Sequence, residues 1–309
     1  MSNPKFAFVF PGQGSQSQGM LQELADRFPA VRERFAKGSE VLGFDLWDLS
    51  QNGPEEKLNQ TMNTQPVLLC ASIAIWDVWC QSSDMRPAIM AGHSFGEYSA
   101  LVAAGALKFE QAVSLVADRG RYIQEAVAGI ETAMAAVLGL DQSALSEVCQ
   151  EAAGGDLVCQ CANLNAPGQI VIAGHRAAID KACELAKARG ARRAMPLNVS
   201  APIHCELMRP AAARLAARID TVEITAPTTP VVHNFDADFH NDIQGMKEAL
   251  IGQLYSPVRW IECIEQAAAA GCQSVVECGP GKVLNGLIKR IDRELSAHSI
   301  HEPEALSKA

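Results

Sequence analysis

The chain has 309 residues, of which 48% are hydrophobic and 20% charged, and its formal net charge at pH 7 is −9. This length and composition exclude a mainly disordered chain and a small domain that needs disulfides or a metal to fold. The acidic balance argues against generic binding to nucleic acid or to an anionic membrane, because both would repel the protein.

The N-terminal part of the sequence alternates apolar strand patterns with helical patterns. The runs Phe6–Phe10 and Ala88–Ala91 predict short buried strands, whereas Met62–Trp79 and the residues up to about Val127 predict helices. Alternating strands and helices are typical of a parallel sheet covered by helices. We therefore expect an α/β fold.

A different pattern begins at Ala133. Strands are predicted at Ala133–Gly139, Leu157–Asn163, Gln169–Gly174 and Ala194–Val199, with helices at Asp141–Ala153 and Ala177–Arg189 and a turn at Asn165–Gly168. This β-α-β-β-α-β order is that of a ferredoxin-like unit. We expect this small subdomain to span residues 128–200 and to be inserted between two segments of a larger domain, 1–127 and 201–309.

The larger domain is expected to resume after Ser200. The patterns predict helices from about Cys205, near Ile243–Leu254 and at Trp260–Ala270, and strands at Pro230–Asn234 and Ser274–Glu277. The polar tail, Ser296–Ala309, is expected to be loose.

The sequence predicts a soluble cytoplasmic protein. Residues 1–10 lack the long apolar run of a signal peptide, and the longest uncharged stretch, 58–76, contains too many polar residues to span a membrane. The ten cysteines form no C-x-x-C pair and lie mostly in apolar runs, as expected of buried thiols in a reducing compartment. We also expect a monomer and no metal site.

The strongest local signal for chemistry is Gly92-His93-Ser94-Phe95-Gly96, which has the form G-x-S-x-G. It follows a predicted strand and precedes a helical run, and this is the context of a nucleophile elbow. In such an elbow the glycines allow a tight bend that lifts the serine hydroxyl clear of the sheet. An ordinary glycine-rich turn has the same spacing, but the context favours Ser94 as a nucleophile.

A serine nucleophile needs a base, which is usually a histidine. His204 precedes a predicted helix where the chain re-enters the larger domain, and it is either this base or a buried structural residue. His93 adjoins Ser94 but is expected to point away from it. No Asp follows Ser94 in the Ser-Asp-His order of the α/β-hydrolases. The remaining histidines are expected in turns or polar tails: His175, His233, His240, His298 and His301.

Arg119 lies in the middle of the apolar face of the helix predicted over Gln111–Val127, between Val116 and Ile123. A buried guanidinium is costly unless it is paired. Arg119 therefore either meets an internal carboxylate or binds an anionic ligand, whose carboxylate its planar fork would match.

Two glycine-rich segments do not fit nucleotide-binding patterns. Phe10–Gln16 fails the G-x-G-x-x-G spacing and Gly279–Lys282 fails the P-loop spacing. We expect an ordinary turn at the second segment. Gln13, at the end of the first strand, can instead direct an amide or backbone N–H towards the active site.

Together these segments resemble the malonyl-CoA:acyl carrier protein transacylases. The resemblance runs in family order from about residue 5 to about residue 295 and rests on Phe8–Gln16, Gly92–Leu101, Asp118–Gly120, Pro202–His204, Gln253–Val258 and Glu277–Gly281. It implies a large α/β-hydrolase-like domain with an inserted ferredoxin-like subdomain, and an active site in the cleft between them.

The resemblance also implies a role for each catalytic candidate. Ser94 would be the nucleophile and His204 its base, oriented by a backbone carbonyl near Gln253 instead of by an Asp. The backbone N–H groups of Gln13 and Phe95 would form the oxyanion hole.

Further implied roles concern the substrate. Arg119 would pair with the free carboxylate of the malonyl group, and Asn163 and Asn165 would line the cleft near the CoA or pantetheine arm. Phe95 stands where the family more often has Leu, and the segment Ser200–Ile203 varies with acyl specificity, so the acyl pocket is expected to differ in shape.

The implied reaction is ping-pong transfer of malonyl from malonyl-CoA to the phosphopantetheine thiol of acyl carrier protein, in fatty acid biosynthesis. It needs no cofactor beyond the coenzyme A thioester and the carrier's phosphopantetheine. Two alternatives stay open: an acyltransferase serving a polyketide or polyunsaturated-lipid synthase, and a serine hydrolase acting on acyl-CoA or acyl carriers. A non-catalytic carrier-binding scaffold is disfavoured by the intact candidate residues.

Carrier proteins are acidic, so docking to this acidic chain requires a local positive surface. Lys187, Arg189, Arg192 and Arg193 cluster at the end of a predicted helix in the small subdomain. They form either this docking surface or a solvated helix C-terminus that complements the helix dipole.

Overall fold

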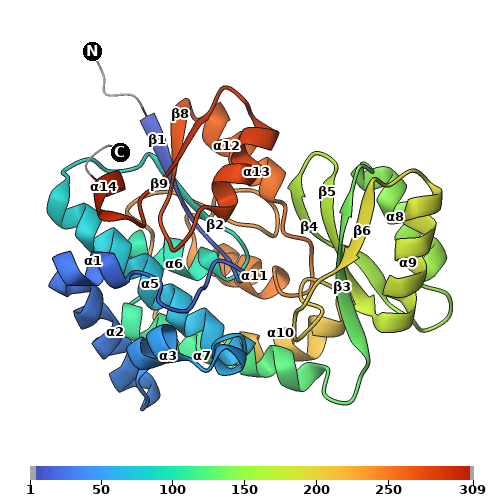
Figure 1. Cartoon of the computed structure of the whole chain (residues 1–309), viewed down its shortest axis with the longest axis horizontal. Helices are drawn as coiled ribbons and strands as arrows, with labels where there is room; N and C mark the ends of the chain where they lie inside the picture. Colours follow the sequence, from blue (N-terminus) through green and yellow to red (C-terminus); the bar gives the residue numbers. More distant parts are fainter. Residues whose placement is uncertain (1–4, 307–309) are drawn as a thin grey trace.

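The computed structural model describes residues 5–306. These residues form two separate sheets and the helices that pack on them (Figure 1). The larger sheet has the order β7-β2-β1-β8-β9, and each neighbouring pair is parallel. Its strands are β1 (Lys5–Phe10), β2 (Ile89–Gly92), β7 (Val231–Val232), β8 (Cys272–Glu277) and β9 (Ser296–Ser299).

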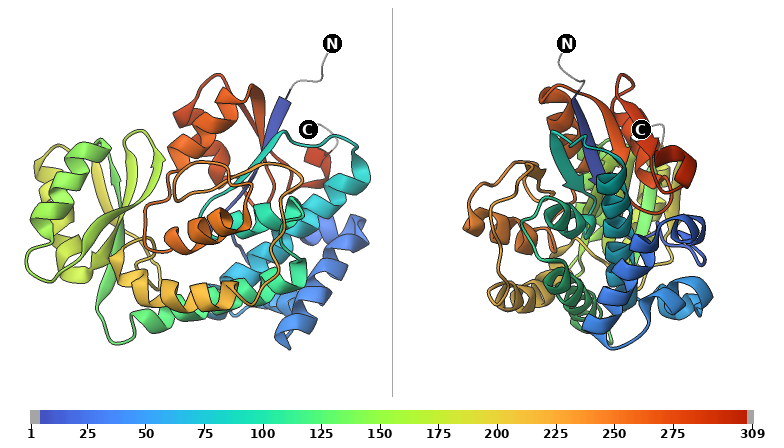
Figure 2. Two further views of the ribbon diagram at one scale, coloured as in Figure 1. Left: turned by 180° about the vertical axis from the view of Figure 1, so that it is seen from behind. Right: turned by 90° about the vertical axis from the view of Figure 1, so that its left-hand side faces the viewer.

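Helices cover both faces of this sheet (Figures 1 and 2). The N-terminal half contributes α1 (Gln22–Arg27), α2 (Pro29–Leu42), α3 (Leu46–Asn52), α4 (Glu55–Leu58), α5 (Thr61–Ser82), α6 (Gly96–Ala103) and α7 (Phe109–Ala126). The C-terminal half contributes the short 3-10 helix η1 (Glu206–Met208), α10 (Arg209–Ile219), α11 (Ile243–Gly252), α12 (Trp260–Ala269), α13 (Val283–Ile291) and α14 (Pro303–Leu306).

Strand β1 shows why both faces must be covered. Side chains alternate across a strand, and Phe8 packs in the core that includes α5, whereas Ala7 and Val9 pack in the core that includes α12 and α13. The Phe8 ring lies edge-on to Trp76 and Trp79 of α5, with centroids 5.5 and 5.1 Å apart. A strand that is apolar on both faces is therefore central in the sheet.

The smaller sheet has the order β4-β5-β3-β6 and is antiparallel. Its elements are β3 (Thr132–Leu138), α8 (Gln142–Ala152), β4 (Cys159–Ala166), β5 (Gln169–His175), α9 (Arg176–Ala188) and β6 (Arg193–Pro196). Asp141 caps α8 by accepting a hydrogen bond from the N–H of Ala144 at 2.8 Å. The predicted α/β fold with a β-α-β-β-α-β unit is confirmed, while the exact boundaries at residues 128 and 200 stay a prediction.

The small subdomain projects from one end of the larger region (Figures 1 and 2). Strand β4 joins the two, because Leu164 N–H donates to the Val258 carbonyl and Val258 N–H donates to the Ala162 carbonyl, both at 2.9 Å. This pairing fixes Asn163, which lies between Ala162 and Leu164, next to the larger domain.

Three sequence predictions need correction. The strand expected at Ala194–Val199 ends at Pro196, and the strand expected at Pro230–Asn234 is only β7. Strand β4 continues to Ala166, so only Pro167 and Gly168 remain for the turn. In each case pairing with a neighbouring strand, and not hydrophobicity, determines where the strand ends.

The C-terminal tail is not loose in its described part. Strand β9 pairs with β8, and Ile300 is fully buried in the main core. The pairing covers an edge of the parallel sheet that would otherwise expose its N–H and C=O groups. The same prediction for residues 307–309 lies outside the described residues, as does the signal-peptide argument for residues 1–4.

None of the helices within residues 5–306 combines the length and apolar character that crossing a membrane requires.

Candidate active site

The two segments that carry the first site residues follow neighbouring strands. Phe10 of β1 is in register with Gly92 of β2, and the His93 N–H donates to the Phe10 carbonyl at 2.9 Å. Because parallel strands end at the same edge of a sheet, the turns that contain Gln13 and Ser94 come together there.

Ser94 lies in a strained turn that its glycines make possible. Its backbone φ is +55°, in the left-handed region that non-glycine residues rarely adopt. A Cβ on Gly92 would come within 1.9 Å of the Gly96 carbonyl carbon, and a Cβ on Gly96 within 2.4 Å of the Phe10 oxygen. The glycines of the G-x-S-x-G motif are therefore required by close backbone contacts.

Ser94 and His204 form a hydrogen-bonded pair. Ser94 Oγ lies 2.7 Å from His204 Nε2, and His204 Nδ1 lies 2.7 Å from the main-chain oxygen of Gln253. A carbonyl can only accept, so Nδ1 carries the proton and Nε2 is free to accept the serine proton. His204, which the sequence left either as a base or as a structural residue, thus has the hydrogen bonds that a general base would need, and a main-chain carbonyl takes the place of an Asp.

The surroundings of His204 favour its neutral form. The side chain is buried, and this burial lowers its pKa to about 3, with the positive charge of Arg119 acting in the same direction. His204 is therefore unprotonated, as a general base must be, throughout the neutral range.

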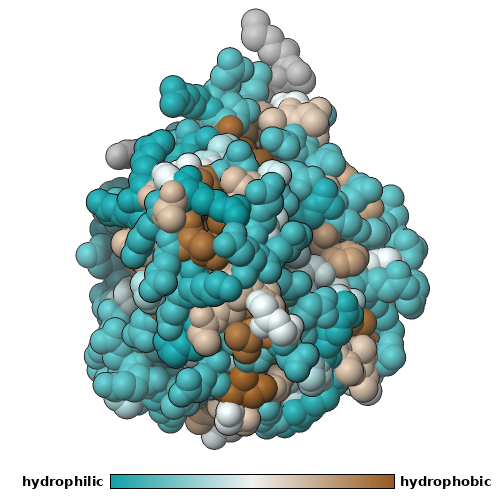
Figure 3. Space-filling view, turned by 90° about the vertical axis from the view of Figure 1, so that its right-hand side faces the viewer, coloured by the Kyte–Doolittle hydropathy of each residue, from teal (hydrophilic) through white to brown (hydrophobic). Residues whose placement is uncertain are grey.

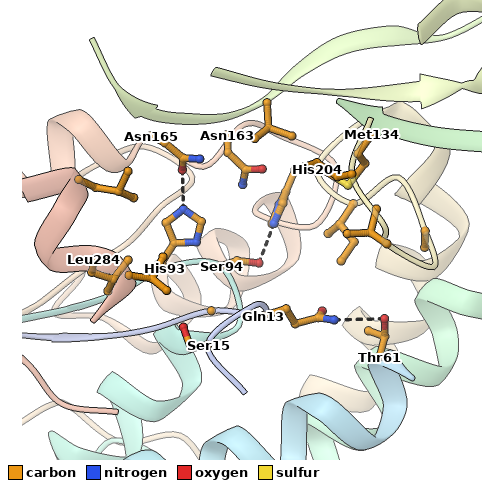
Figure 4. Close-up of a pocket in the computed structure, with 18 of the residues that line it drawn as sticks. Gln13, Ser15, Thr61, His93, Ser94, Met134, Asn163, Asn165, His204 and Leu284 are labelled. Atoms are coloured by element: carbon orange, nitrogen blue, oxygen red, sulfur yellow. Dashed lines mark hydrogen bonds between the residues drawn. The ribbon is translucent and has the colours of Figure 1, made fainter. Parts of the chain in front are cut away.

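The Ser94–His204 pair faces a cavity of about 240 Å³ between the two regions (Figure 4). The larger domain contributes Ser94, His204 and Leu284 to its lining, and the small subdomain contributes Met134 and Asn163. The cleft expected between the two domains is thus present in the structure.

Asn163 and Asn165 both line this cavity. Asn165 Oδ1 accepts a hydrogen bond from His93 Nε2 at 2.7 Å (Figure 4). His93 also lines this cavity, but its ring bonds Asn165 and not Ser94, whose partner is His204. The bond to Asn165 joins the serine loop to the small subdomain. Burial lowers the pKa of His93, so its ring is neutral.

Arg119 is fully buried and does not line the cavity. Its Nη2 donates to Gln253 Oε1 at 3.0 Å, whereas Nε and Nη1 donate no hydrogen bond to a described residue. The guanidinium carbon lies 5.8 Å from the centre of the Tyr98 ring. Arg119 forms no ion pair with a carboxylate within residues 5–306. Of the two possibilities that its position left open, the internal ion pair is not observed, and two N–H groups remain for an anion.

Gln13 and Phe95 flank Ser94 from the two turns. The Gln13 side chain is held by two hydrogen bonds: its Oε1 accepts from Gln65 Nε2 at 3.1 Å, and its Nε2 donates to Thr61 Oγ1 at 3.3 Å. Phe95 is fully buried at the start of α6. The backbone N–H groups of both residues donate to no described residue, so they are free to bind a developing oxyanion.

Three buried residues around Ser94 are not evident from the sequence. Asn234 Oδ1 accepts from the Ser94 N–H at 2.7 Å, and Asn234 Nδ2 donates to the Gly92 carbonyl at 2.8 Å. Glu97 accepts from His233 Nδ1 at 2.7 Å. Their only sequence signal is a polar residue inside a buried element, at Glu97 and in Val231-Val232-His233-Asn234.

The other histidines do not all lie in turns or tails as expected. His233 is fully buried, His175 ends β5, and His298 belongs to β9. None of the three bonds Ser94, whose partner is His204.

The basic residues of the small subdomain lie away from the cavity. Arg189 is paired with Glu147 and Glu151, whereas Arg192 and Arg193 are exposed at the start of β6. Lys187, near the end of α9, is also exposed. The face of the molecule on this side is mainly hydrophilic, with small hydrophobic areas between the polar ones (Figure 3).

Among the described residues, no three His, Cys, Asp or Glu side chains are grouped as ligands for a metal ion.

Comparison with known proteins identifies the family. A family model described as an acyl transferase domain matches residues 7–300. The chain is 52% identical over 305 residues to the malonyl CoA-acyl carrier protein transacylase of Salmonella typhimurium, a match that covers 99% of this chain and 98% of that protein. The chain belongs to the malonyl-CoA:acyl carrier protein transacylase family.

Solved structures of this transacylase family have the same fold. An acyl carrier protein S-malonyltransferase from Vibrio cholerae superposes with a TM-score of 0.96 at 51% identity, over 98% of this chain and 99% of that one. A malonyl-transacylase solved in complex with its type II polyketide acyl carrier protein gives 0.97 at 49% identity, over 99% and 98%. The expected α/β-hydrolase-like domain with a ferredoxin-like insertion is the fold of this family.

Proposed function

We propose that this chain transfers a malonyl group from malonyl-CoA to the phosphopantetheine thiol of an acyl carrier protein in fatty acid synthesis. The observation that carries the proposal is the Ser94–His204 hydrogen bond of 2.7 Å at a nucleophile elbow, in a chain of this family. Relatives about 50% identical over their full length carry the name malonyl CoA-acyl carrier protein transacylase.

In the first half-reaction Ser94 Oγ attacks the thioester carbonyl of malonyl-CoA while His204 Nε2 takes the serine proton. The tetrahedral oxyanion accepts hydrogen bonds from the backbone N–H groups of Gln13 and Phe95. When the intermediate collapses, the carbon–sulfur bond breaks and His204 returns the proton to the leaving CoA thiolate. The malonyl group remains on Ser94 as an ester.

In the second half-reaction the phosphopantetheine thiol enters the cavity and gives its proton to His204. The thiolate attacks the malonyl-serine ester, and the second tetrahedral intermediate uses the same two N–H groups. Ser94 then leaves with the proton from His204. The reaction exchanges one thioester for another, so we propose that it needs no metal or further cofactor. The site must exclude water, which would otherwise hydrolyse the ester.

We assign Arg119 to the free carboxylate of the malonyl group. Its Nε and Nη1 groups donate no hydrogen bond to a described residue, so each is available to an oxygen of the carboxylate. A bidentate contact would also use Nη2, which shares an edge of the guanidinium with each of them and which donates to Gln253 in this structure. Arg119 is bonded to Gln253 and does not line the cavity. Side chains near Gln253 must therefore move to let the malonyl carboxylate reach Arg119. Asn163 and Asn165 line the cavity from the small subdomain, and we place the pantetheine arm beside them.

The decisive experiment is to incubate the protein with malonyl-CoA and to measure its intact mass. We expect a malonyl adduct that maps to Ser94, is absent from Ser94→Ala, and disappears when a holo-carrier protein is added. Absence of the adduct would refute the transferase mechanism. Loss of malonyl to water faster than to the carrier would instead identify a serine hydrolase.

A second candidate is the same chemistry with a polyketide carrier. It is favoured by the 49% identity to a malonyl-transacylase that was solved with a type II polyketide carrier. Parallel transfer assays with fatty acid and polyketide carriers distinguish the two, because the physiological carrier should give the larger kcat/KM.

We also propose that the protein works in the cytoplasm. The thiols of Cys149, Cys159 and Cys161 lie close together without forming a disulfide, and this fits a reducing compartment. Fractionation of cells, with detection of the protein in each fraction by an antibody, tests this location.

A further inference from the structure

The side chain of Gln253 links three groups of the candidate site. Its Oε1 accepts from Arg119 Nη2 at 3.0 Å, and its Nε2 donates to the Ser94 carbonyl at 3.0 Å and to Glu97 Oε2 at 2.7 Å. The orientation of this one amide therefore determines whether Arg119 faces an acceptor or a donor.

Of the two acceptors of the Gln253 NH2, Glu97 forms the shorter hydrogen bond and is the only side chain. It is fully buried on α6, three residues after Ser94. Besides Gln253 Nε2, its oxygens receive the Asn234 N–H at 2.9 Å and His233 Nδ1 at 2.7 Å. A carboxylate that receives three N–H groups acts only as an acceptor. Gln253 must then turn its NH2 towards Glu97 and its oxygen towards Arg119.

A reversed Gln253 amide would be unfavourable on both sides. Its oxygen would face the Glu97 carboxylate, and its NH2 would face the Arg119 guanidinium, so each buried contact would lose its hydrogen bond. Arg119 would have to move away from the amide. The two N–H groups that it keeps free for a ligand would move with it.

We propose that Glu97 is a positioning residue that sets the selectivity for malonyl over acetyl groups, acting on Arg119 through the Gln253 side chain. This inference rests on the proposed function, in which Arg119 binds the malonyl carboxylate. An acetyl group has no carboxylate, so its transfer does not depend on where the free N–H groups of Arg119 point. Displacing Arg119 should therefore lower malonyl transfer selectively.

Two conservative variants separate the effect of the side-chain length of Glu97 from the effect of its charge. Glu97→Gln removes the charge but keeps an oxygen for Gln253 Nε2 and the Asn234 N–H. Its new NH2 can donate to His233 Nδ1 if the ring takes its other tautomer, because His233 Nε2 has no partner among the described residues. Glu97→Asp keeps the charge but shortens the side chain by one methylene, so its oxygens no longer reach Gln253.

The measurement is the ratio of kcat/KM for malonyl-CoA to that for acetyl-CoA, with a holo-carrier as acceptor. We expect Glu97→Asp to lower this ratio by about tenfold or more, the effect of losing one charge-assisted hydrogen bond. Glu97→Gln should keep the ratio within about threefold of the wild type. A matched control is Glu110→Asp, at an exposed position in the first turn of α7.

The opposite pattern, with the ratio lowered in Glu97→Gln and kept in Glu97→Asp, would show that charge and not orientation matters and would overturn the proposal. So would an unchanged ratio in both variants, since a purely structural role lowers malonyl and acetyl transfer equally. If Glu97→Asp does not fold, His233→Phe removes a donor that fixes Glu97 and must lower the ratio in the same direction. A wild type that forms no malonyl adduct rejects the proposed function instead.

Discussion

The backbone N–H of Ser94 donates to Oδ1 of Asn234 at 2.7 Å, across 140 residues of sequence. Asn234 follows β7, which pairs with β2 ahead of the serine turn. The same side chain donates to the Gly92 carbonyl, so it holds the turn on both sides of His93. The left-handed conformation of Ser94 is therefore maintained by a side chain from the segment after a neighbouring strand and not by the turn alone.

Replacing Asn234 with Ala should impair catalysis by loosening this turn. Both the Ser94 N–H and the Gly92 carbonyl would lose a buried partner, and Ser94 Oγ would no longer be held against His204. We expect kcat to fall by about tenfold or more and the melting temperature to decrease. Steady-state kinetics and thermal unfolding measure both effects, with Asn52→Ala, an exposed residue of α3, as control. Unchanged kcat would show that the turn holds its shape without Asn234.

The sequence indicates those site residues whose signal is local. Ser94 is evident from the spacing of its two glycines, and Arg119 from its place on an apolar helix face. His204 has no such signal, because its pairing depends on the chain returning from the inserted subdomain. Glu97, His233 and Asn234 were missed for the same reason. Their contacts join residues more than 130 positions apart, and no short spacing encodes them.

The strands of the fold also differ in how well local sequence predicts them. Strands β1 and β2 are largely apolar runs, and β8 contains the buried pair Val275-Val276; the sequence predicts all three within a few residues. Strand β9 has the sequence Ser-Ala-His-Ser, which contains no strand pattern. It forms because the edge of β8 supplies hydrogen-bonding partners and because Ile300 is buried next to it. Such edge strands depend on tertiary structure and cannot be recognised from local hydrophobicity.

Replacing Arg119 with Met should separate malonyl transfer from acetyl transfer. Met fills a similar volume without a charge, so only the acyl group that carries a carboxylate should lose a partner. We expect kcat/KM for malonyl-CoA to fall by about 100-fold relative to acetyl-CoA, the range of a buried charged hydrogen bond. Competition between the two thioesters in one assay gives this ratio directly.

The same variant should be at least as stable as the wild type. Arg119 is fully buried with two unpartnered N–H groups, and removing such a group relieves a desolvation penalty. We expect the melting temperature to rise by about 2 °C. A lower melting temperature with equal losses for both acyl groups would assign Arg119 a structural role instead.

We expect the enzyme to stay active at pH values well below the usual pKa of a histidine. Burial and the charge of Arg119 lower the pKa of His204 from 6.5 to about 3, and the base works only while it is unprotonated. With acetyl-CoA as substrate, kcat/KM should therefore stay flat between about pH 8 and pH 5. In Arg119→Met one cause of the lowered pKa is gone, so the acidic limb should move to higher pH. A wild-type limb centred near pH 6.5, or a downward shift in the variant, would contradict this assignment.

Docking of an acidic carrier can be tested at Arg192 and Arg193, which are exposed and, unlike Arg189, form no ion pair with another described residue. Opposite charges increase the rate of encounter and fix orientation, so reversing both residues to Glu should raise KM for the carrier. We expect a rise of about tenfold at low salt, with KM for malonyl-CoA unchanged, because malonyl-CoA enters through the cavity.

The control is a charge reversal elsewhere on the surface. Reversing Lys37 and Lys57, exposed on α2 and α4, changes the net charge equally and should leave KM for the carrier as it is. If both double variants act alike, only the overall charge matters. If the Arg192 and Arg193 variant raises both KM values, these residues affect the fold and not the docking.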